Sequence, residues 1–155
     1  NPASASHHVI GVWNNALVRK TARVMTRLGS ERSWIVYGTD GLDETSLTAP
    51  TNVAEIDGNS IREFTVTAAD FGVGSIDGDL PLNCTAEQSS AIIRSVLSNE
   101  MPGRDAENLV LINAAAAIYV AGGSGSLTEA FETARTAVRD GSAALKLRQM
   151  SNLSI

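Results

Sequence analysis

The 155-residue chain has 43% hydrophobic and 19% charged residues, a balance typical of a soluble globular protein and not of a disordered or fibrous one. Its net charge of -5 disfavours a nucleic-acid partner, because phosphate backbones are bound by clustered lysines and arginines. The single cysteine, Cys84, excludes an internal disulfide, so we expect a cytoplasmic protein. No apolar run approaches the roughly 20 residues that cross a bilayer, so we expect no membrane partner.

The first part of the chain predicts a strand, a helix and a second strand. Residues 9–12 form a short apolar run rich in β-branched side chains. In residues 16–28, apolar side chains recur at three- and four-residue steps. Asn14 or Asn15 is suited to cap that helix, and residues 34–37 indicate a second buried strand. This order is typical of a right-handed crossover between parallel strands, so we expect an α/β fold.

The middle of the chain predicts an antiparallel hairpin. Residues 52–56 and 61–66 flank Asp57-Gly58-Asn59-Ser60, which has the composition of a tight turn. The hairpin should extend an edge of the sheet, giving a parallel-to-mixed arrangement. Residues 67–72 then indicate one capped turn, and a loop follows.

The rest of the chain predicts helices. Asp105 is placed to cap the second of them, and Ser126 with Glu129 matches a capping box at the start of the third. The expected helices cover residues 86–97, 105–121, a stretch ending at Asp140, and 142–150. We see no linker, so residues 1–155 are interpreted as a single α/β segment.

Asp43 and Glu44 are the first candidates for a functional site. They follow the strand at residues 34–37, and ligands bind at the carboxyl ends of strands in open α/β sheets. Magnesium prefers oxygen ligands and is commonly held by one or two carboxylates, waters and substrate phosphates. An Asp-Glu pair in a loop is also common as a solvated surface pair, so the residues alone leave both interpretations open.

Other polar motifs have simpler explanations. The glycine run at residues 122–126 could cradle a phosphate, but no strand precedes it and no lysine follows, so a turn between helices is favoured. His7 and His8 are neighbours on a predicted strand and should point to opposite faces, which prevents them from sharing a metal. Asn113 lies within an alanine-rich helix, where it is more typical of a structural hydrogen-bond partner than of a ligand. No residue is predicted to be a catalytic nucleophile.

Blocks spread over nearly the whole chain resemble the anthranilate phosphoribosyltransferase family in order and spacing. The most specific is Gly41-Leu42-Asp43-Glu44 directly after a strand. The others include Asn1-Pro2-Ala3 and residues 9–12, 28–32, 36–38, 48–51, 61–63, 70–72, 91–97, 104–105 and 113–116.

The resemblance implies a fold, a reaction and site residues. The fold would be the C-terminal half of a three-layer α/β/α catalytic domain related to nucleoside phosphorylases. The glycosyltransferase would move a phosphoribosyl group from phosphoribosyl pyrophosphate to anthranilate in tryptophan biosynthesis. Asp43 and Glu44 would bind magnesium at the pyrophosphate, and Pro2 and Ala3 would border the anthranilate channel. The parent enzyme would be a homodimer through its N-terminal region.

Parts of the family pattern do not occur in residues 1–155. The upstream helical domain, the Gly-Thr-Gly-Gly-Asp loop and the Lys-His-Gly-Asn-Arg segment are missing, which implies that this stretch alone is inactive. The segment Leu82-Asn83-Cys84-Thr85 also departs from the family pattern. Two alternatives stay open: a non-catalytic nucleotide-binding relative with the same fold, and a related nucleoside phosphorylase.

Overall fold

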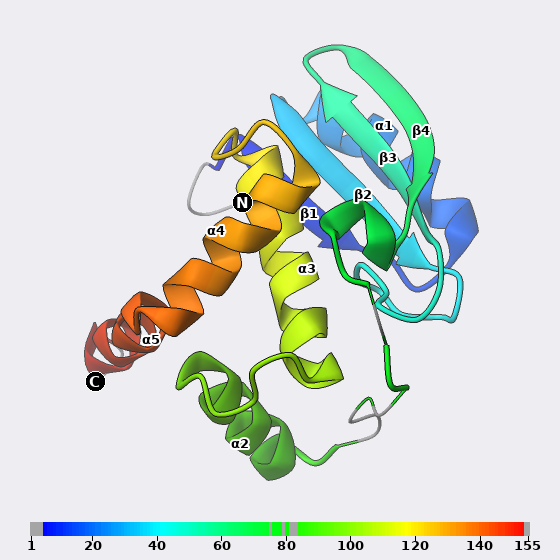
Figure 1. Ribbon diagram of the computed structural model, residues 1–155. Coiled ribbons are helices and arrows are strands. Elements are labelled where there is room, and N and C mark those ends of the chain that lie inside the picture. Colours follow the sequence, from blue (N-terminus) through cyan, green and yellow to red (C-terminus); the bar gives the residue numbers. More distant parts are fainter. Residues whose placement is uncertain (1–4, 75, 79, 81–83, 154–155) are drawn as a thin grey trace.

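A mixed sheet with helices on both faces forms the centre of the computed structural model, which describes residues 5–74, 76–78, 80 and 84–153 (Figure 1). The elements follow in the order β1 (His7–Gly11), α1 (Asn15–Arg27), β2 (Arg32–Gly38), β3 (Thr51–Asp57), β4 (Ser60–Val66), the 3-10 helix η1 (Ala68–Phe71), α2 (Ala86–Leu97), α3 (Asp105–Val120), α4 (Leu127–Arg139) and α5 (Ser142–Leu153). The predicted strands and helices are therefore confirmed, with small shifts at their ends.

The sheet has four strands in the order β1-β2-β3-β4. β1 and β2 are parallel, with Val9 opposite Trp34, because α1 carries the chain back across the sheet. β3 and β4 are the predicted hairpin and pair antiparallel, and Gly58 closes their turn with a φ of 57°. β3 also pairs antiparallel with β2, so the hairpin extends the sheet and makes it mixed, as expected.

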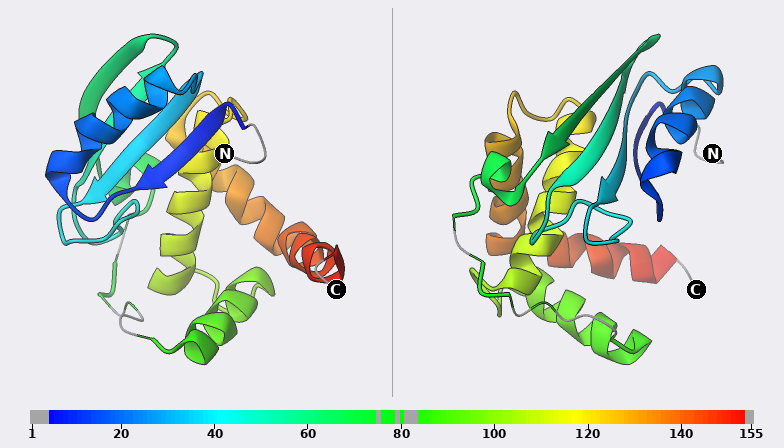
Figure 2. Two further views of the ribbon diagram at one scale, coloured as in Figure 1. Left: turned by 180° about the vertical axis from the view of Figure 1, so that it is seen from behind. Right: turned by 90° about the vertical axis from the view of Figure 1, so that its right-hand side faces the viewer.

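Alternate residues of the strands pack into two separate cores. Ile35 and Ile56 lie under α1, where Val18 and Ala22 are buried against them. Trp34 and Val53 face the other way, into a core shared with α3 and α4. Successive side chains of a strand point to opposite faces, so one short strand serves both cores. The result is the predicted three-layer α/β/α arrangement (Figure 2).

The helix ends test three capping predictions. Asn14 caps α1 by accepting a hydrogen bond from the Ala16 amide at 2.9 Å, as one of the two expected residues. The prediction for Asp105 was wrong, because Arg104 occupies the cap position of α3 and the Asp105 carboxylate accepts from the amide of Gly78 at 2.7 Å.

The capping box of α4 forms only in part. Ser126 accepts from the Glu129 amide at 3.2 Å, but the Glu129 carboxylate accepts from the Gly125 amide and does not reach back to the cap residue. Short-range patterns therefore locate these helix starts, while the partner of each side chain depends on the neighbouring loop.

Candidate functional site

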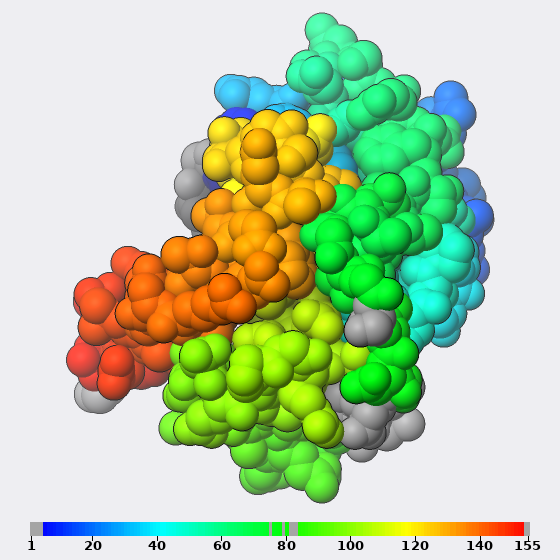
Figure 3. All heavy atoms as spheres, viewed as in Figure 1, coloured from blue at the N-terminus to red at the C-terminus, as the bar shows by residue number. Residues whose placement is uncertain are grey.

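The loop between β2 and β3 lies at the end of the sheet where ligands bind in α/β folds. Gly38 ends β2 and pairs with Thr51 at the start of β3, so residues 39–50 form a loop that connects two paired strand ends. β1 and the parallel strand β2 have their carboxyl ends at this edge. In Figure 3 the loop, coloured cyan, reaches the molecular surface beside the green segment that contains η1. Asp43 and Glu44 therefore lie in the loop after the carboxyl end of β2, which is the location predicted from the sequence.

Backbone hydrogen bonds give the loop a defined shape. The Gly38 amide donates to the Leu42 carbonyl at 2.8 Å, and the Thr39 amide donates to the Pro50 carbonyl at 2.9 Å. The Ser46 amide donates to the Thr51 hydroxyl at 2.8 Å. Each bond joins the two halves of the loop or ties the loop to a strand, so the segment is a compact loop closed by its own contacts.

Asp40 is the carboxylate that stabilises the loop through hydrogen bonds to other loop residues. It accepts hydrogen bonds from the hydroxyls of Ser46 at 2.5 Å and Thr48 at 3.0 Å, and from the Leu42 amide at 3.4 Å. Partial burial raises the pKa of Asp40, but these hydrogen bonds outweigh it and hold the pKa below its usual value. Asp40 is thus an ionised structural group, a role that sequence reasoning missed.

Asp43 and Glu44 differ from Asp40 because their carboxylates make no hydrogen bond or ion pair with any residue that the structure describes. Asp43 is exposed and Glu44 is half-buried. Burial raises the pKa of Glu44, and the negative charges of Asp43 and Asp40 raise it further. A cation at this position would offset that repulsion.

The donor set fits magnesium better than a metal that needs many protein ligands. No group of three or more His, Cys, Asp or Glu side chains suited to a metal occurs among the described residues. Two adjacent carboxylates remain, and magnesium commonly takes one or two carboxylates and completes its shell with water and substrate phosphates. Asp43 and Glu44 are therefore residues that could hold it, which stays a prediction.

Gly11, at the end of β1, lies directly against the backbone of Asp43. A Cβ atom added to Gly11 would lie 1.5 Å from the Asp43 carbonyl oxygen and 2.5 Å from its carbon. A side chain at position 11 is incompatible with this approach, so the glycine allows the loop to contact β1. Gly11 was noted in the sequence only as part of a strand, and nothing in its spacing indicated a contact with the loop.

Asn113 reaches the same loop from α3. Its carboxamide oxygen accepts from the Thr45 amide at 2.8 Å, and its amino group donates to the Thr45 carbonyl at 3.0 Å. The amino group also donates to the Leu109 carbonyl within α3, at 3.0 Å. The prediction that Asn113 is a structural hydrogen-bond partner is confirmed.

The hydroxyl of Thr45 is fully buried without a hydrogen-bond partner in the described part of the chain. An unmade hydrogen bond at a buried polar atom costs about 1–3 kcal/mol. We therefore expect Thr45→Val, which keeps the shape of the side chain, to increase the free energy of unfolding by about 1 kcal/mol in urea denaturation. Thr51→Val is the matched control: it should destabilise the protein, because it removes the acceptor of the Ser46 amide. A Thr45→Val protein that is less stable would show that the hydroxyl has a partner such as water.

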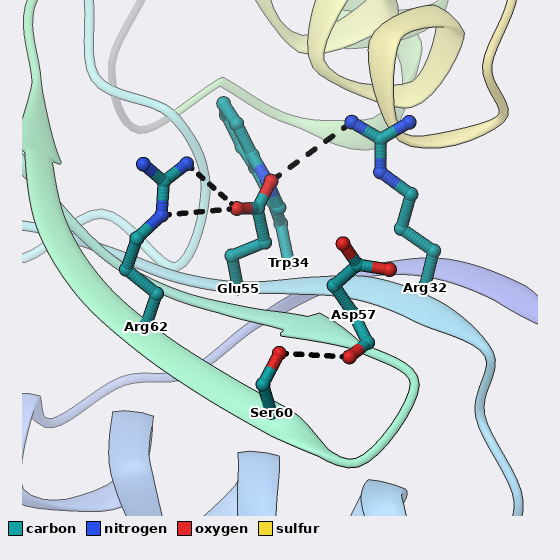
Figure 4. A network of polar contacts seen from close by, with 6 residues as sticks. All are labelled: Arg32, Trp34, Glu55, Asp57, Ser60 and Arg62. Carbon is teal, nitrogen blue, oxygen red and sulfur yellow. Dashed lines mark hydrogen bonds and ion pairs between the residues drawn. The ribbon is translucent and has the colours of Figure 1, made fainter.

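A second charged cluster, on the α3 side of the sheet, pairs one carboxylate with two guanidinium groups (Figure 4). The buried Glu55 carboxylate accepts from the Trp34 indole nitrogen at 3.0 Å and from Arg62 Nη2 at 2.8 Å, and Arg32 Nη2 lies 4.0 Å away. The Arg32 guanidinium also stacks on the ring of Tyr119, 4.7 Å from its centroid. These contacts cross-link β2, β3, β4 and α3, so the cluster is structural.

The other sequence candidates lie away from the loop or outside the described residues. The glycine run joins α3 to α4, and the contact of Tyr119 with Arg32 places that end of α3 near the start of β2, opposite the loop. Gly122 has a φ of 77°, as a helix end requires, so the turn interpretation is confirmed. His8 contacts the Ser30 hydroxyl at 2.9 Å, whereas His7 contacts Ser6. Pro2 and Ala3 lie outside the described residues, and their role stays a prediction.

Comparison with known proteins places this architecture in a family. Residues 1–144 match the family described as the glycosyl transferase family, a/b domain. The chain belongs to this glycosyl transferase family. The a/b domain is similar to the anthranilate phosphoribosyltransferase of Nitrosomonas europaea, at 42% identity over 99% of this chain and 45% of the relative. It is also 42% identical to that of Teredinibacter turnerae, over 97% of this chain and 45% of the relative. The chain thus spans less than half the length of these relatives.

Solved structures share the fold of the a/b domain. The anthranilate phosphoribosyltransferase of Thermus thermophilus superposes with a TM-score of 0.79 at 29% identity, over 96% of this chain and 43% of that one. The Saccharomyces cerevisiae enzyme, solved in complex with phosphoribosyl pyrophosphate and magnesium, gives 0.76 at 24% identity, over 92% and 41%. The resemblance expected from the sequence blocks is confirmed. None of the described helices has the length and apolar character needed to span a membrane.

Proposed function

We propose that this chain is the a/b-domain part of an anthranilate phosphoribosyltransferase that acts in tryptophan biosynthesis. The observation that carries the proposal is the pair Asp43 and Glu44, two carboxylates without a partner among the described residues, on a closed loop at the carboxyl end of β2. The names of the relatives at 42% identity support the substrates, anthranilate and phosphoribosyl pyrophosphate. The magnesium complex of the yeast enzyme supports the choice of metal.

In this proposal the chain supplies metal ligands and holds them in place. Asp43 and Glu44 would bind magnesium through their carboxylate oxygens, while Asp40 keeps its hydrogen bonds with the hydroxyls of Ser46 and Thr48. Magnesium, when bound, supplies Lewis-acid stabilisation of the charge that gathers on a pyrophosphate leaving group. A nucleophilic side chain is not required, because correct placement of the amine and the sugar, with charge stabilisation, accounts for most of the acceleration.

The remaining binding groups would come from residues outside this chain. The glycine-rich diphosphate loop of the family does not occur in residues 1–155, and the relatives are more than twice as long as the matched region. We therefore propose that the isolated 155-residue chain is inactive. The homodimer of the parent enzyme and its cytoplasmic location are likewise predictions.

An assay of the full-length protein tests the function. With phosphoribosyl pyrophosphate and magnesium, we expect consumption of anthranilate, followed by its fluorescence, and loss of that activity when EDTA removes the metal. Addition of excess magnesium should restore the rate. A protein that binds phosphoribosyl pyrophosphate without any transfer would instead support the non-catalytic nucleotide-binding alternative. Transfer by the pure 155-residue chain would contradict the incomplete-site proposal.

A further inference from the structure

We propose that Asn113 is a positioning residue for the metal loop, defined here as residues 39–50, and that its carboxamide fixes the direction in which Asp43 and Glu44 present their oxygens. This inference rests on the proposed function, because it concerns the same carboxylates. Asn113 itself would not contact magnesium or substrate. It acts through the backbone of Thr45, the residue that follows Glu44 in the chain.

The contact between Asn113 and Thr45 has the pattern of a backbone pair. One carboxamide accepts from the Thr45 amide and donates to the Thr45 carbonyl, as a neighbouring strand would do. A residue with only a donor or only an acceptor cannot make both bonds. The additional bond to the Leu109 carbonyl ties the carboxamide to its own helix. The Thr45 backbone and the α3 backbone together therefore determine the orientation of the Asn113 carboxamide.

The position of Thr45 explains why this contact acts on the carboxylates. The Thr45 amide belongs to the planar peptide group that also contains the carbonyl of Glu44. Holding that amide fixes the plane and restricts the backbone rotation next to the Glu44 side chain. Gly11 supports the loop at the neighbouring residue, where the Asp43 backbone lies against β1. The backbone that carries the two carboxylates is thus held between a strand and a helix.

α3 is a firm support for such a contact. Leu111 and Ile112, which precede Asn113, are almost completely buried at 1% and 0% exposure, and Ala115 and Ala116 are at 0%. These residues belong to the core on that face of the sheet. Because core positions are closely packed, the helix cannot shift to follow a displaced loop. Loss of the Asn113 carboxamide should therefore leave α3 in place and free the Thr45 peptide group to rotate.

Magnesium titrations of the full-length enzyme test the proposal. For Asn113→Ala we expect the magnesium concentration at half-maximal rate to rise about tenfold, the order seen when partners behind metal ligands are removed. Turnover should recover in part at saturating magnesium. Asn108→Ala, which removes the same group from α3 without contacting Thr45, should leave the magnesium dependence unchanged. Ile56→Ala, in the separate core under α1 and at the end of β3 away from the loop, should lower stability and leave the magnesium dependence unchanged.

Amide hydrogen exchange separates this proposal from the proposed function. The Thr45 amide should be protected in the wild type and in Asn108→Ala, and should exchange faster in Asn113→Ala, whether or not the protein transfers phosphoribosyl groups. Unchanged exchange at Thr45, or a magnesium requirement of Asn113→Ala that matches that of Ile56→Ala, would overturn the positioning role. Absence of magnesium-dependent transfer in the wild type would instead overturn the function.

Discussion

Asp43→Asn combined with Glu44→Gln should lower the turnover of the full-length protein by about 100-fold or more, the order expected when charge stabilisation of a transition state is removed. Both changes keep the size of the side chain and remove its negative charge, so the loop loses its attraction for a cation. The magnesium concentration at half-maximal rate should rise in the same variant. Steady-state rates measured across a magnesium series check both effects.

The stability of this double variant separates a lost metal site from a damaged fold. The pKa of Glu44 is raised in the folded protein, so its ionised form is less favourable there than in the unfolded chain, and the group lowers stability as pH rises through that pKa. Neutral side chains remove this effect. We therefore expect the double variant to unfold at the same temperature as the wild type or higher at neutral pH without metal, measured by calorimetry.

A matched control removes two charges elsewhere. Glu31 and Glu100 are exposed, Glu31 precedes β2 at the end of the strand opposite the loop, and Glu100 follows α2. Glu31→Gln with Glu100→Gln changes the net charge by the same amount. This control should keep wild-type turnover and magnesium dependence. Equal behaviour of the two double variants would mean that Asp43 and Glu44 act only through overall charge, and the metal role would be abandoned.

Much of the fold was predictable because its signals are local. Asn14 caps α1, Gly58 closes the hairpin, and the strand at residues 34–37 is a continuous apolar run. Such patterns depend on neighbours a few residues apart, which the sequence displays directly. The order strand, helix, strand then restricts β1 and β2 to a parallel pair, because a crossover connection cannot place them otherwise.

The division of roles among the loop carboxylates was not predictable in the same way. Asp40 and Asp43 are the same residue type three positions apart, and either could have been assigned to a metal. Only the folded loop brings the hydroxyls of Ser46 and Thr48 onto Asp40, leaving Asp43 without such partners among the described residues. The contact of Asn113 with Thr45 spans 68 positions and follows no period, so no pattern in the chain indicates it.

Gly11→Ala should have the second large effect, a loss of about 3 kcal/mol in the free energy of unfolding, at the upper end of overpacking costs. The added Cβ would lie 1.5 Å from a backbone oxygen of Asp43, and a backbone cannot rotate away as a flexible side chain can. The loop must therefore leave β1 or the strand must distort. Either change displaces the residues next to Glu44, so the magnesium requirement should rise together with the loss of stability. Urea denaturation and the magnesium series measure the two effects.

Gly74→Ala is the matched control, because a Cβ at Gly74 would meet no described atom within 4 Å and its φ is not positive. It should keep wild-type stability and magnesium dependence. If Gly11→Ala behaved like this control, the close approach of β1 to the loop would be wrong. If it lost stability but kept its magnesium requirement, Gly11 would matter only for packing. A loss of stability together with a higher magnesium requirement would show that the contact between Gly11 and Asp43 determines the position of the carboxylates relative to the sheet.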